Sequence, residues 1–197
     1  MLKKFAFALV LVAAVVAGLS VSMWRQGPSN TTGYPGFGGE FTLESVNGST
    51  SLSDFRGEVV VLYFGFASCP DVCPATLGKV RAALAELSRG ERDRVNVVLV
   101  SLDPERDTAE RVGAYAASFG EKFIGLTGAG AAIDEVARNY GVLHQKVELP
   151  DSALGYTIDH NSNTFVIGAD GVVRHIVSHG SDVSEYRDRI RDTLDDA

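Results

Sequence analysis

The sequence predicts an α/β fold: a central mixed sheet flanked by helices, preceded by an N-terminal hairpin and one N-terminal transmembrane helix. Two uninterrupted apolar runs, residues 59–66 and 95–102, have the composition of central strands that are buried on both faces. Each run is followed by a segment whose apolar residues have helical spacing. An uncharged apolar stretch of 20 residues, 5–24, lies near the start of the chain.

This first stretch is expected to be a membrane anchor over residues 1–24. A helix of 20 residues spans roughly 30 Å, the thickness of the hydrocarbon core of a bilayer. Lys3 and Lys4 precede the stretch and should stay in the cytoplasm, while Trp24 suits the far interface. A cleaved signal peptide is the alternative. Either interpretation exports the domain, to the periplasm of a bacterium or to the mitochondrial intermembrane space of a eukaryote.

Residues 25–39 are rich in Gly and Pro and are expected to form a flexible linker, which leaves 40–197 as the folded domain. The formal net charge is −7, and three of the 18 basic residues lie in residues 1–25, where no acidic residue occurs. The remaining 15 basic residues face 25 acidic ones. This balance argues against nucleic acid as a partner, because nucleic-acid binding needs a basic surface.

The elements follow in order along the domain. Residues 41–46 alternate as a strand, and Asn47-Gly48 predicts a hairpin turn. After the strand at 59–66, a helix is predicted over 74–90, with Pro74 in its first turn and Gly90 at its end. After the strand at 95–102, a helix over 107–119 begins with a sequence that resembles a capping box.

The second half begins with a short strand at 123–126 and a helix at 131–140 that Gly141 should end. Residues 142–149 begin a strand-and-loop excursion. A hairpin is predicted from 164–167 and 172–177 around Asp170-Gly171, and Asp182 opens the last helix. A βαβ core followed by a hairpin and a helix is the order of the thioredoxin-like fold. That fold places its chemistry at the carboxyl end of 59–66.

Two cysteines, Cys69 and Cys73, lie at this junction of strand and helix. The N-terminus of a helix lowers the pKa of a thiol. A structural disulfide is the alternative in an exported protein, yet closing so short a loop adds only about 2 kcal/mol. Helical i,i+4 spacing places Cβ atoms about 5–6 Å apart, which suits two thiolates that share a metal ion. Because Cys69 precedes the helix, a redox pair is also possible. Soft thiolates favour Cu(I) or zinc, and an added imidazole allows Cu(II).

Residues 66–74, with Cys-Pro-Asp-Val-Cys-Pro at their centre, resemble the signature of the Sco/SenC family of copper-binding proteins required for cytochrome c oxidase assembly. Residues 100–108 (VSLDPERDT) and 156–160 (YTIDH) also match in order, and the resemblance covers roughly 41–194. It implies that Cys69, Cys73 and His160 are the copper ligands. It also implies that Asp71 tunes the loop and that Asp159 orients the imidazole.

His160 lies just before the predicted strand at 164–167, where thioredoxin-like proteins face their cysteines. Asn163 stands where those proteins usually have a cis-proline, a departure from a general disulfide oxidoreductase. His175 and His179 are expected to be structural or solvated, and His144 is a candidate for a second copper contact. The acidic segment 103–107 is interpreted as a turn, a helix cap and an internal ion pair rather than as a metal site.

The leading hypothesis is therefore a copper metallochaperone, loaded by an upstream donor, that delivers copper to a subunit of cytochrome c oxidase. The alternative is a thiol–disulfide reductase that uses Cys69 and Cys73 to keep the oxidase cysteines reduced. A peroxidase is disfavoured because the Thr-x-x-Cys pattern is absent: Phe66 and Pro70 lie three residues before the cysteines. A purely structural domain is the remaining hypothesis, and enzymatic activity is left open.

Overall fold

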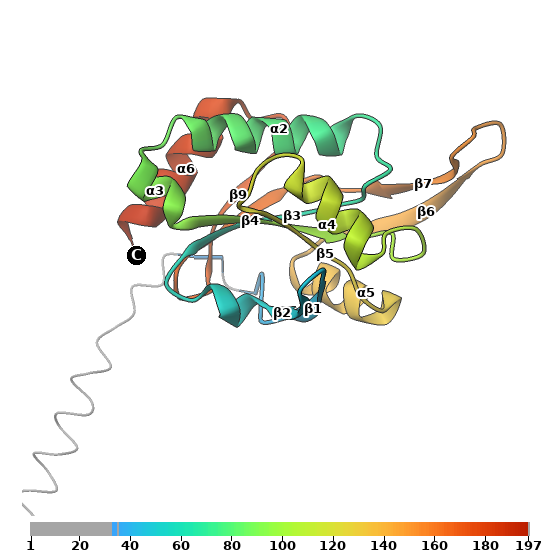
Figure 1. The fold of residues 1–197 in the computed structure, drawn as a ribbon, viewed down its shortest axis with the longest axis horizontal. Helices are drawn as coiled ribbons and strands as arrows, with labels where there is room; N and C mark the ends of the chain where they lie inside the picture. The colour runs from blue at the N-terminus through green and yellow to red at the C-terminus, as the bar shows by residue number, and fades with distance from the viewer. Residues whose placement is uncertain (1–32, 35, 197) are drawn as a thin grey trace, which may run out of the picture. The chain divides into compact units, whose positions relative to one another are not determined.

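A five-stranded mixed sheet with the order β5-β4-β3-β8-β9 forms the centre of the folded unit (Figure 1). The computed structural model describes residues 33–34 and 36–196. Three strands run parallel, and β8 and β9 complete the sheet as an antiparallel hairpin. The strands are β3 (Val59–Gly65), β4 (Val95–Ser101), β5 (Phe123–Leu126), β8 (Thr164–Ile167) and β9 (Val173–Val177).

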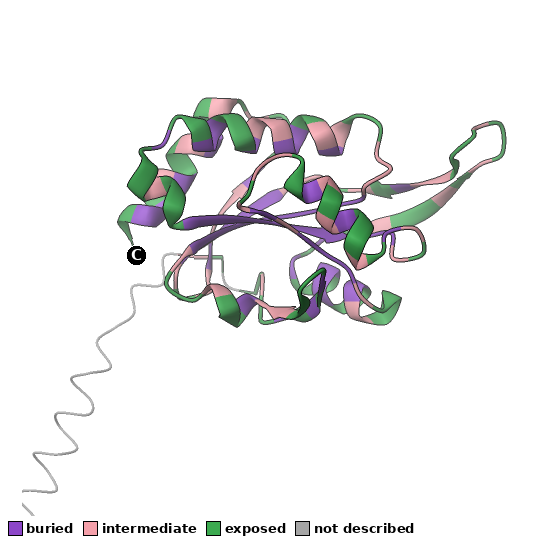
Figure 2. Cartoon of the chain, in the orientation of Figure 1, coloured by how far each residue is buried: buried purple, intermediate pink, exposed green. Residues whose placement is uncertain are grey.

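Helices α2 (Val72–Ala85) and α6 (Val183–Asp195) pack against each other over one face of this sheet (Figure 1). The other face is covered by α5 (Gly130–Asn139) and by the hairpin of β1 (Thr42–Ser45) and β2 (Gly48–Ser51). Helix α4 (Ala109–Ala117) contacts β4, β5 and β1. Because both faces are covered, every residue of β3 and β4 is buried (Figure 2), as their apolar composition predicts.

The α/β class, the central mixed sheet and the N-terminal hairpin are confirmed. The helix predicted over 74–90 is wrong at both ends, because α2 begins at Val72 and ends at Ala85. Gly90 lies in a separate short helix, α3 (Arg89–Asp93). Ser88 starts this helix with a capping box: its hydroxyl accepts from the Glu91 N–H, and the Glu91 carboxylate accepts from the Ser88 N–H. A short 3-10 helix, η1 (Leu52–Phe55), was not predicted either.

Gly141 ends α5 as predicted, with a left-handed φ of 64°. The N–H of Val142 donates to the carbonyl of Ala137 at 2.8 Å, and the N–H of Gly141 donates to the carbonyl of Arg138 at 3.0 Å. These two bonds form a Schellman motif, which turns the chain sharply out of the helix. The turn directs the following residues toward the carboxyl end of β3.

The predicted excursion is a β-hairpin of β6 (His144–Leu149) and β7 (Gly155–His160), and β7 was not predicted as a strand. The two strands pair antiparallel as a separate two-stranded sheet, which projects from the folded unit (Figure 1). His160 is the last residue of β7 and lies four residues before β8. The hairpin therefore delivers His160 to the end of the central sheet where the cysteines lie.

The anchor predicted over residues 1–24 lies outside the described residues. From Gly33 onward, with Pro35 left aside, no helix combines the length and the apolar character needed to cross a bilayer. Part of the predicted linker contacts the folded unit. The N–H of Tyr34 donates to the carbonyl of Val173 at 3.1 Å, and the N–H of Gly38 donates to that of Asn139 at 2.7 Å.

Candidate metal centre

The loop between β3 and α2 carries both cysteines. Cys69 lies in the loop, where its N–H donates to the carbonyl of Phe66 at 3.2 Å. Cys73 lies in the first turn of α2, and its N–H donates to the sulfur of Cys69 at 3.5 Å. Both thiols are free. The predicted juxtaposition of Cys69 and Cys73 at a helix N-terminus is thus present in the structure.

The two sulfurs have very different surroundings. Cys73 is fully buried, whereas Cys69 is partly exposed. The hydroxyl of Tyr63 on β3 donates to the Cys73 sulfur at 3.7 Å. Gly65, at the end of β3, leaves the space that this sulfur occupies, because a Cβ there would lie 2.8 Å from the Cys73 sulfur. Cys73 therefore depends on a glycine at position 65.

The pKa values of the two thiols move apart. The pKa of Cys69 is lowered to about 5, first by the side-chain hydrogen bond from Cys73 and further by the N–H groups of Cys73 and Asp71. The pKa of Cys73 is raised, because its thiol donates that hydrogen bond and is buried. At neutral pH the pair therefore holds one thiolate, on the partly exposed Cys69.

His160 faces this loop from the end of β7. Its Nδ1 lies 3.1 Å from the carbonyl oxygen of Asn161. With the proton on Nδ1 this contact is a hydrogen bond, and Nε2 keeps its lone pair. Burial lowers the pKa of His160, which favours the neutral imidazole that metal binding needs. The ring also packs edge-on against Tyr63 and Phe66, with centroids 6.3 Å apart in both cases.

Cys69 and His160 line the same cleft of about 340 Å³. The other lining residues come from the cysteine loop, from the start of α2, from β6 and β7, and from the turn after β7: Phe66, Pro70, Asp71, Val72, Val147, Thr157, Ile158, Asp159 and Ser162. In the part of the chain that the structure describes, no three His, Cys, Asp or Glu side chains are gathered closely enough to hold a metal ion. The structure thus pairs the two cysteines and places His160 on the same cleft as Cys69.

Asp71 and Asp159 were predicted to support the site without binding the metal. Asp71 precedes α2 and lines the cleft, and its role in tuning the loop stays a prediction. Asp159 was expected to orient His160, but the orienting contact is made by the backbone of Asn161 instead. Asp159 lines the same cleft as His160, while the imidazole Nδ1 is oriented by the carbonyl of Asn161.

Two of the remaining histidines, His144 and His179, have partners that the sequence did not indicate. His144 stands directly opposite His160 in the β6–β7 ladder, and its Nε2 lies 3.1 Å from the carboxylate of Asp134 on α5. The Nδ1 of His179 lies 2.8 Å from the hydroxyl of Thr76. These contacts join residues that are far apart in sequence, so no local pattern could reveal them.

A free Cys-x-x-x-Cys pair at the first strand–helix junction of this mixed sheet defines a thioredoxin-like thiol domain. The chain belongs to the SCO1/SenC family, whose model matches residues 29–195. Relatives include a mitochondrial SCO1 homologue of Arabidopsis thaliana, 40% identical over 70% of this chain, and a SCO2-like protein of Rickettsia conorii, 38% identical over 68%. The matches span 40% and 65% of those two relatives, so the chain covers less than two thirds of their length.

Solved structures agree with this assignment. The crystal structure of Arabidopsis thaliana ScoI with copper bound has a TM-score of 0.74 at 32% identity and covers 82% of this chain and 99% of that one. Bradyrhizobium japonicum ScoI with copper bound has a TM-score of 0.67 at 30% identity, covering 80% of this chain and 99% of the other. The apo Sco1 protein of Thermus thermophilus has a TM-score of 0.68 at 35% identity, with 86% and 98% covered.

Proposed function

We propose that this protein binds copper through Cys69, Cys73 and His160 and passes it to a copper-accepting subunit of cytochrome c oxidase. The observation that carries the proposal is the free thiol pair at the start of α2, whose partly exposed member, Cys69, lines one cleft together with His160. Two thiolates suit Cu(I), and the imidazole adds the harder donor that Cu(II) prefers. Relatives of the same fold have been solved with copper bound.

The asymmetry of the thiol pair supports a cargo site rather than a buried structural one. Cys69 is partly exposed and carries the thiolate, so it can make the first contact with an ion that arrives from a donor protein. Cys73 is deeper and would release its proton when it takes its share of the ion. Reversal of these steps would hand the ion on from the exposed side.

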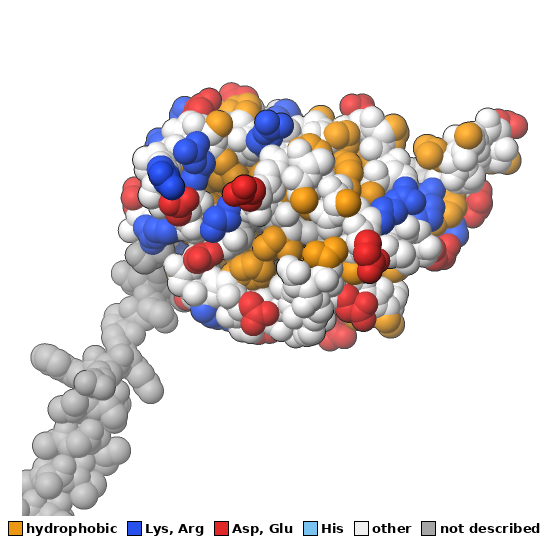
Figure 3. Space-filling view, viewed as in Figure 1, with side chains coloured by type: hydrophobic (Ala, Val, Ile, Leu, Met, Phe, Trp, Pro, Cys, Tyr) orange, Lys and Arg blue, Asp and Glu red, His pale blue; other side chains and the backbone are white. Residues whose placement is uncertain are grey.

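The surface and the N-terminus fit this role. Figure 3 shows acidic and basic side chains interspersed over one face, without a single basic patch of the kind that nucleic acid requires. Residues 1–24 would anchor the domain to a membrane, with the site on its extracytoplasmic side. That placement would bring the domain close to a membrane-bound oxidase.

A second candidate function is reduction of a disulfide between oxidase cysteines, which the low pKa of Cys69 favours. The Cys69 thiolate would attack one sulfur of the partner disulfide and displace the other as a thiolate. Cys73 would then lose its proton, attack the Cys69 sulfur and release the second partner thiol. Two electrons pass to the partner, and a Cys69–Cys73 disulfide remains.

Metal analysis of the reduced full chain in detergent tests the copper site. The wild type should bind one copper ion per chain, and Cys69→Ser and Cys73→Ser should each abolish tight binding, because one thiolate lacks both the charge and the chelation of two. Ser162→Ala changes another residue of the cleft and should bind copper normally. A full equivalent of tightly held copper in either cysteine variant would contradict joint ligation.

A further inference from the structure

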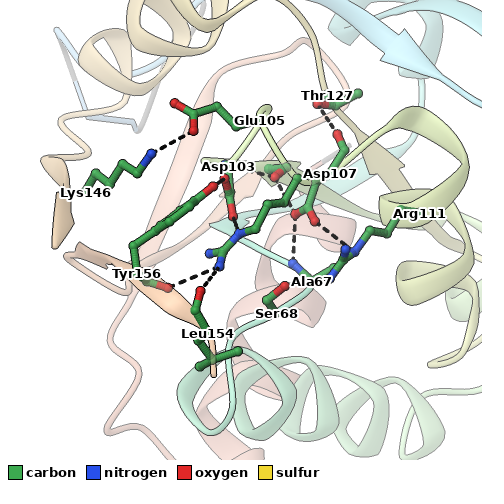
Figure 4. A network of polar contacts seen from close by, with 12 residues as sticks. Ala67, Ser68, Asp103, Glu105, Asp107, Arg111, Thr127, Lys146, Leu154 and Tyr156 are labelled. Carbon is green, nitrogen blue, oxygen red and sulfur yellow. Dashed lines mark hydrogen bonds and ion pairs between the residues drawn. The ribbon is translucent and has the colours of Figure 1, made fainter. Parts of the chain in front are cut away.

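We propose that Asp103, Arg106 and Asp107 form a polar clamp that fixes the position of His160 relative to the Cys69 loop. This inference rests on the proposed copper site. The clamp residues do not line the cleft between Cys69 and His160, so they are positioning residues and not ligands. They lie in the turn between β4 and α4, and Figure 4 shows how Asp103 and Asp107 lie among the residues around them.

The hairpin that carries His160 needs support from the rest of the fold. It forms a two-stranded sheet of its own, and an isolated hairpin is marginally stable in water. Nη1 of Arg106 supplies that support, because it donates to the carbonyl oxygens of Leu154 and Tyr156, each at 3.1 Å. The Tyr156 hydroxyl donates in turn to the carboxylate of Asp103 at 2.8 Å.

Stacking and ion pairing make this side of the clamp rigid. The guanidinium carbon of Arg106 lies 3.7 Å from the centroid of the Tyr156 ring, and Nζ of Lys146 lies 3.9 Å from it. Arg106 also forms an ion pair with Asp103, whose side chain is 2% exposed. A carboxylate this deeply buried is tolerated only with close partners, so Arg106 and Tyr156 are tied to one place.

The other side of the clamp holds the cysteine loop. The buried carboxylate of Asp107 accepts from the N–H of Ala67 at 2.9 Å and from the hydroxyl of Ser101 at 2.7 Å. Arg111 pairs with the same carboxylate at 3.4 Å and donates to the Ser68 hydroxyl at 2.6 Å. Ala67 and Ser68 directly precede Cys69, so these bonds set where the loop begins.

The two sides are joined by a tight turn. The N–H of Asp107 donates to the carbonyl of Asp103 at 2.9 Å, so the two acidic residues are held together by the backbone. The buried carboxylate of Asp103 therefore holds the hairpin through Tyr156, and that of Asp107 holds the cysteine loop through Ala67. Without the clamp, the hairpin would sample more positions, and recruiting His160 would require more loss of conformational freedom. Loss of Arg106 alone would leave the bonds of Asp107 and Arg111 to Ala67 and Ser68, and with them the cysteine loop, in place.

Arg106→Lys tests this inference in the full chain. Lysine keeps a positive charge beside Asp103 but lacks the planar fork of arginine. We expect Cu(II) affinity to fall about 10–100-fold, the range typical for residues that orient a ligand, with weaker nitrogen coupling in the Cu(II) spectrum. Cu(I) affinity should be unchanged. Tyr156→Phe, which loses only one hydroxyl, should shift Cu(II) affinity in the same direction by less.

Arg174→Lys is the matched control, because Arg174 is also mostly buried and pairs with an aspartate, Asp170, at 2.7 Å. It lies on β9, and its ion pair goes to Asp170, which belongs neither to the β6–β7 hairpin nor to the cysteine loop. Its copper affinities should equal those of the wild type. Equal losses of Cu(II) affinity in Arg174→Lys and Arg106→Lys would reduce the effect to general destabilisation and overturn the inference.

A metal-free measurement separates this inference from the proposed function. In the reduced apo protein, Arg106→Lys should speed amide exchange in β6 and β7 and weaken the nuclear Overhauser contacts between the rings of His160 and Phe66. Exchange in β3 and β4 should not change. Unchanged contacts and exchange in Arg106→Lys and Tyr156→Phe would overturn the clamp. Failure of the wild type to bind copper would overturn the proposed function, and the apo measurement would still decide on the clamp.

Discussion

The main-chain N–H of Cys73 points at the sulfur of Cys69 across 3.5 Å, so the deeper cysteine stabilises charge on the shallower one. The arrangement follows from the start of α2, which places Cys73 in its first turn and leaves Cys69 in the loop. The two thiols are therefore chemically unlike, although they belong to one site.

Alkylation of the reduced, metal-free protein should show this difference. Cys69 should react with iodoacetamide much faster than Cys73, because Cys69 carries the thiolate and is more exposed. An ordinary thiol with a pKa of about 8.5 loses reactivity below pH 8. Since the pKa of Cys69 is lowered to about 5, its rate should stay nearly constant from pH 8 to pH 6 and fall as the pH drops through about 5. Mass spectrometry of quenched samples measures both sites.

The same depressed pKa has a consequence for stability. The charged form of Cys69 favours the fold fully above the pKa of an unfolded thiol, and that contribution is lost as the pH falls through about 5.

A Cys69 alkylation rate that follows an ordinary thiol, with a midpoint near pH 8.5, would contradict the thiolate assignment.

Gly65→Ala should destabilise the protein. The added Cβ would lie 2.8 Å from the Cys73 sulfur and 2.9 Å from the Tyr63 ring, and overpacking of this kind costs about 1–3 kcal/mol. Gly78→Ala on α2 is the control: its Cβ meets nothing within 4 Å, and alanine in a helix gains about 0.5–1 kcal/mol over glycine. Urea unfolding should show a lower free energy of unfolding for Gly65→Ala and a higher one for Gly78→Ala than for the wild type. Equal stability of Gly65→Ala and wild type would show that the space beside Cys73 is not tight.

His160→Ala separates the two candidate functions. The Cys69–Cys73 pair should still exchange disulfides, since an imidazole is not obligatory for that reaction, whereas Cu(II) binding should weaken greatly. For a chaperone, cells with His160→Ala should assemble little active oxidase at limiting copper. His144→Gln is the control, because His144 pairs with Asp134 and not with the cysteines. Near-normal oxidase in the His160→Ala strain would favour the reductase.

The membrane topology can be tested with a reporter that is active only outside the cytoplasm. Fused after Ala197, it should be active, and the protein should stay in the membrane fraction, because Lys3 and Lys4 precede an apolar stretch of 20 residues. Replacement of residues 5–24 by a polar segment should abolish both results. Recovery of the wild type as a free protein that begins near Met23 would identify a cleaved signal peptide instead.

The sequence was sufficient for those parts of the fold that depend on local patterns. Buried strands such as β3 and β4 were readable because covered parallel strands are apolar throughout. Gly141 was readable as a helix end because the Schellman motif requires a left-handed residue. Strand β7 was missed because its exposed hairpin alternates weakly and contains polar residues at both kinds of position.

The same limit applies to the site. The resemblance in short motifs predicted Cys69, Cys73 and His160 as ligands, but the contacts that surround them cross the fold. The Tyr63 hydroxyl reaches Cys73 from β3, and the backbone of Asn161 makes the contact with His160 that was expected of Asp159. The segment 103–107 was interpreted as a turn, a helix cap and an ion pair: the turn and the ion pair are present, but the cap of α4 is Thr108. Its contacts with Ala67 and Tyr156 join residues about 40 and 50 positions away, which no local pattern reveals.

The hydrogen bond between the N–H of Tyr34 and the carbonyl of Val173 affects where a soluble fragment of the protein should begin. Strand β9 is an edge of the central sheet, and unpaired edges invite pairing between copies of a protein. The Tyr34 N–H donates a hydrogen bond to the carbonyl of Val173 on this edge, so that this carbonyl is not left unpaired. A fragment that starts at Glu40 would expose that carbonyl and should self-associate more readily than one that starts before Gly33.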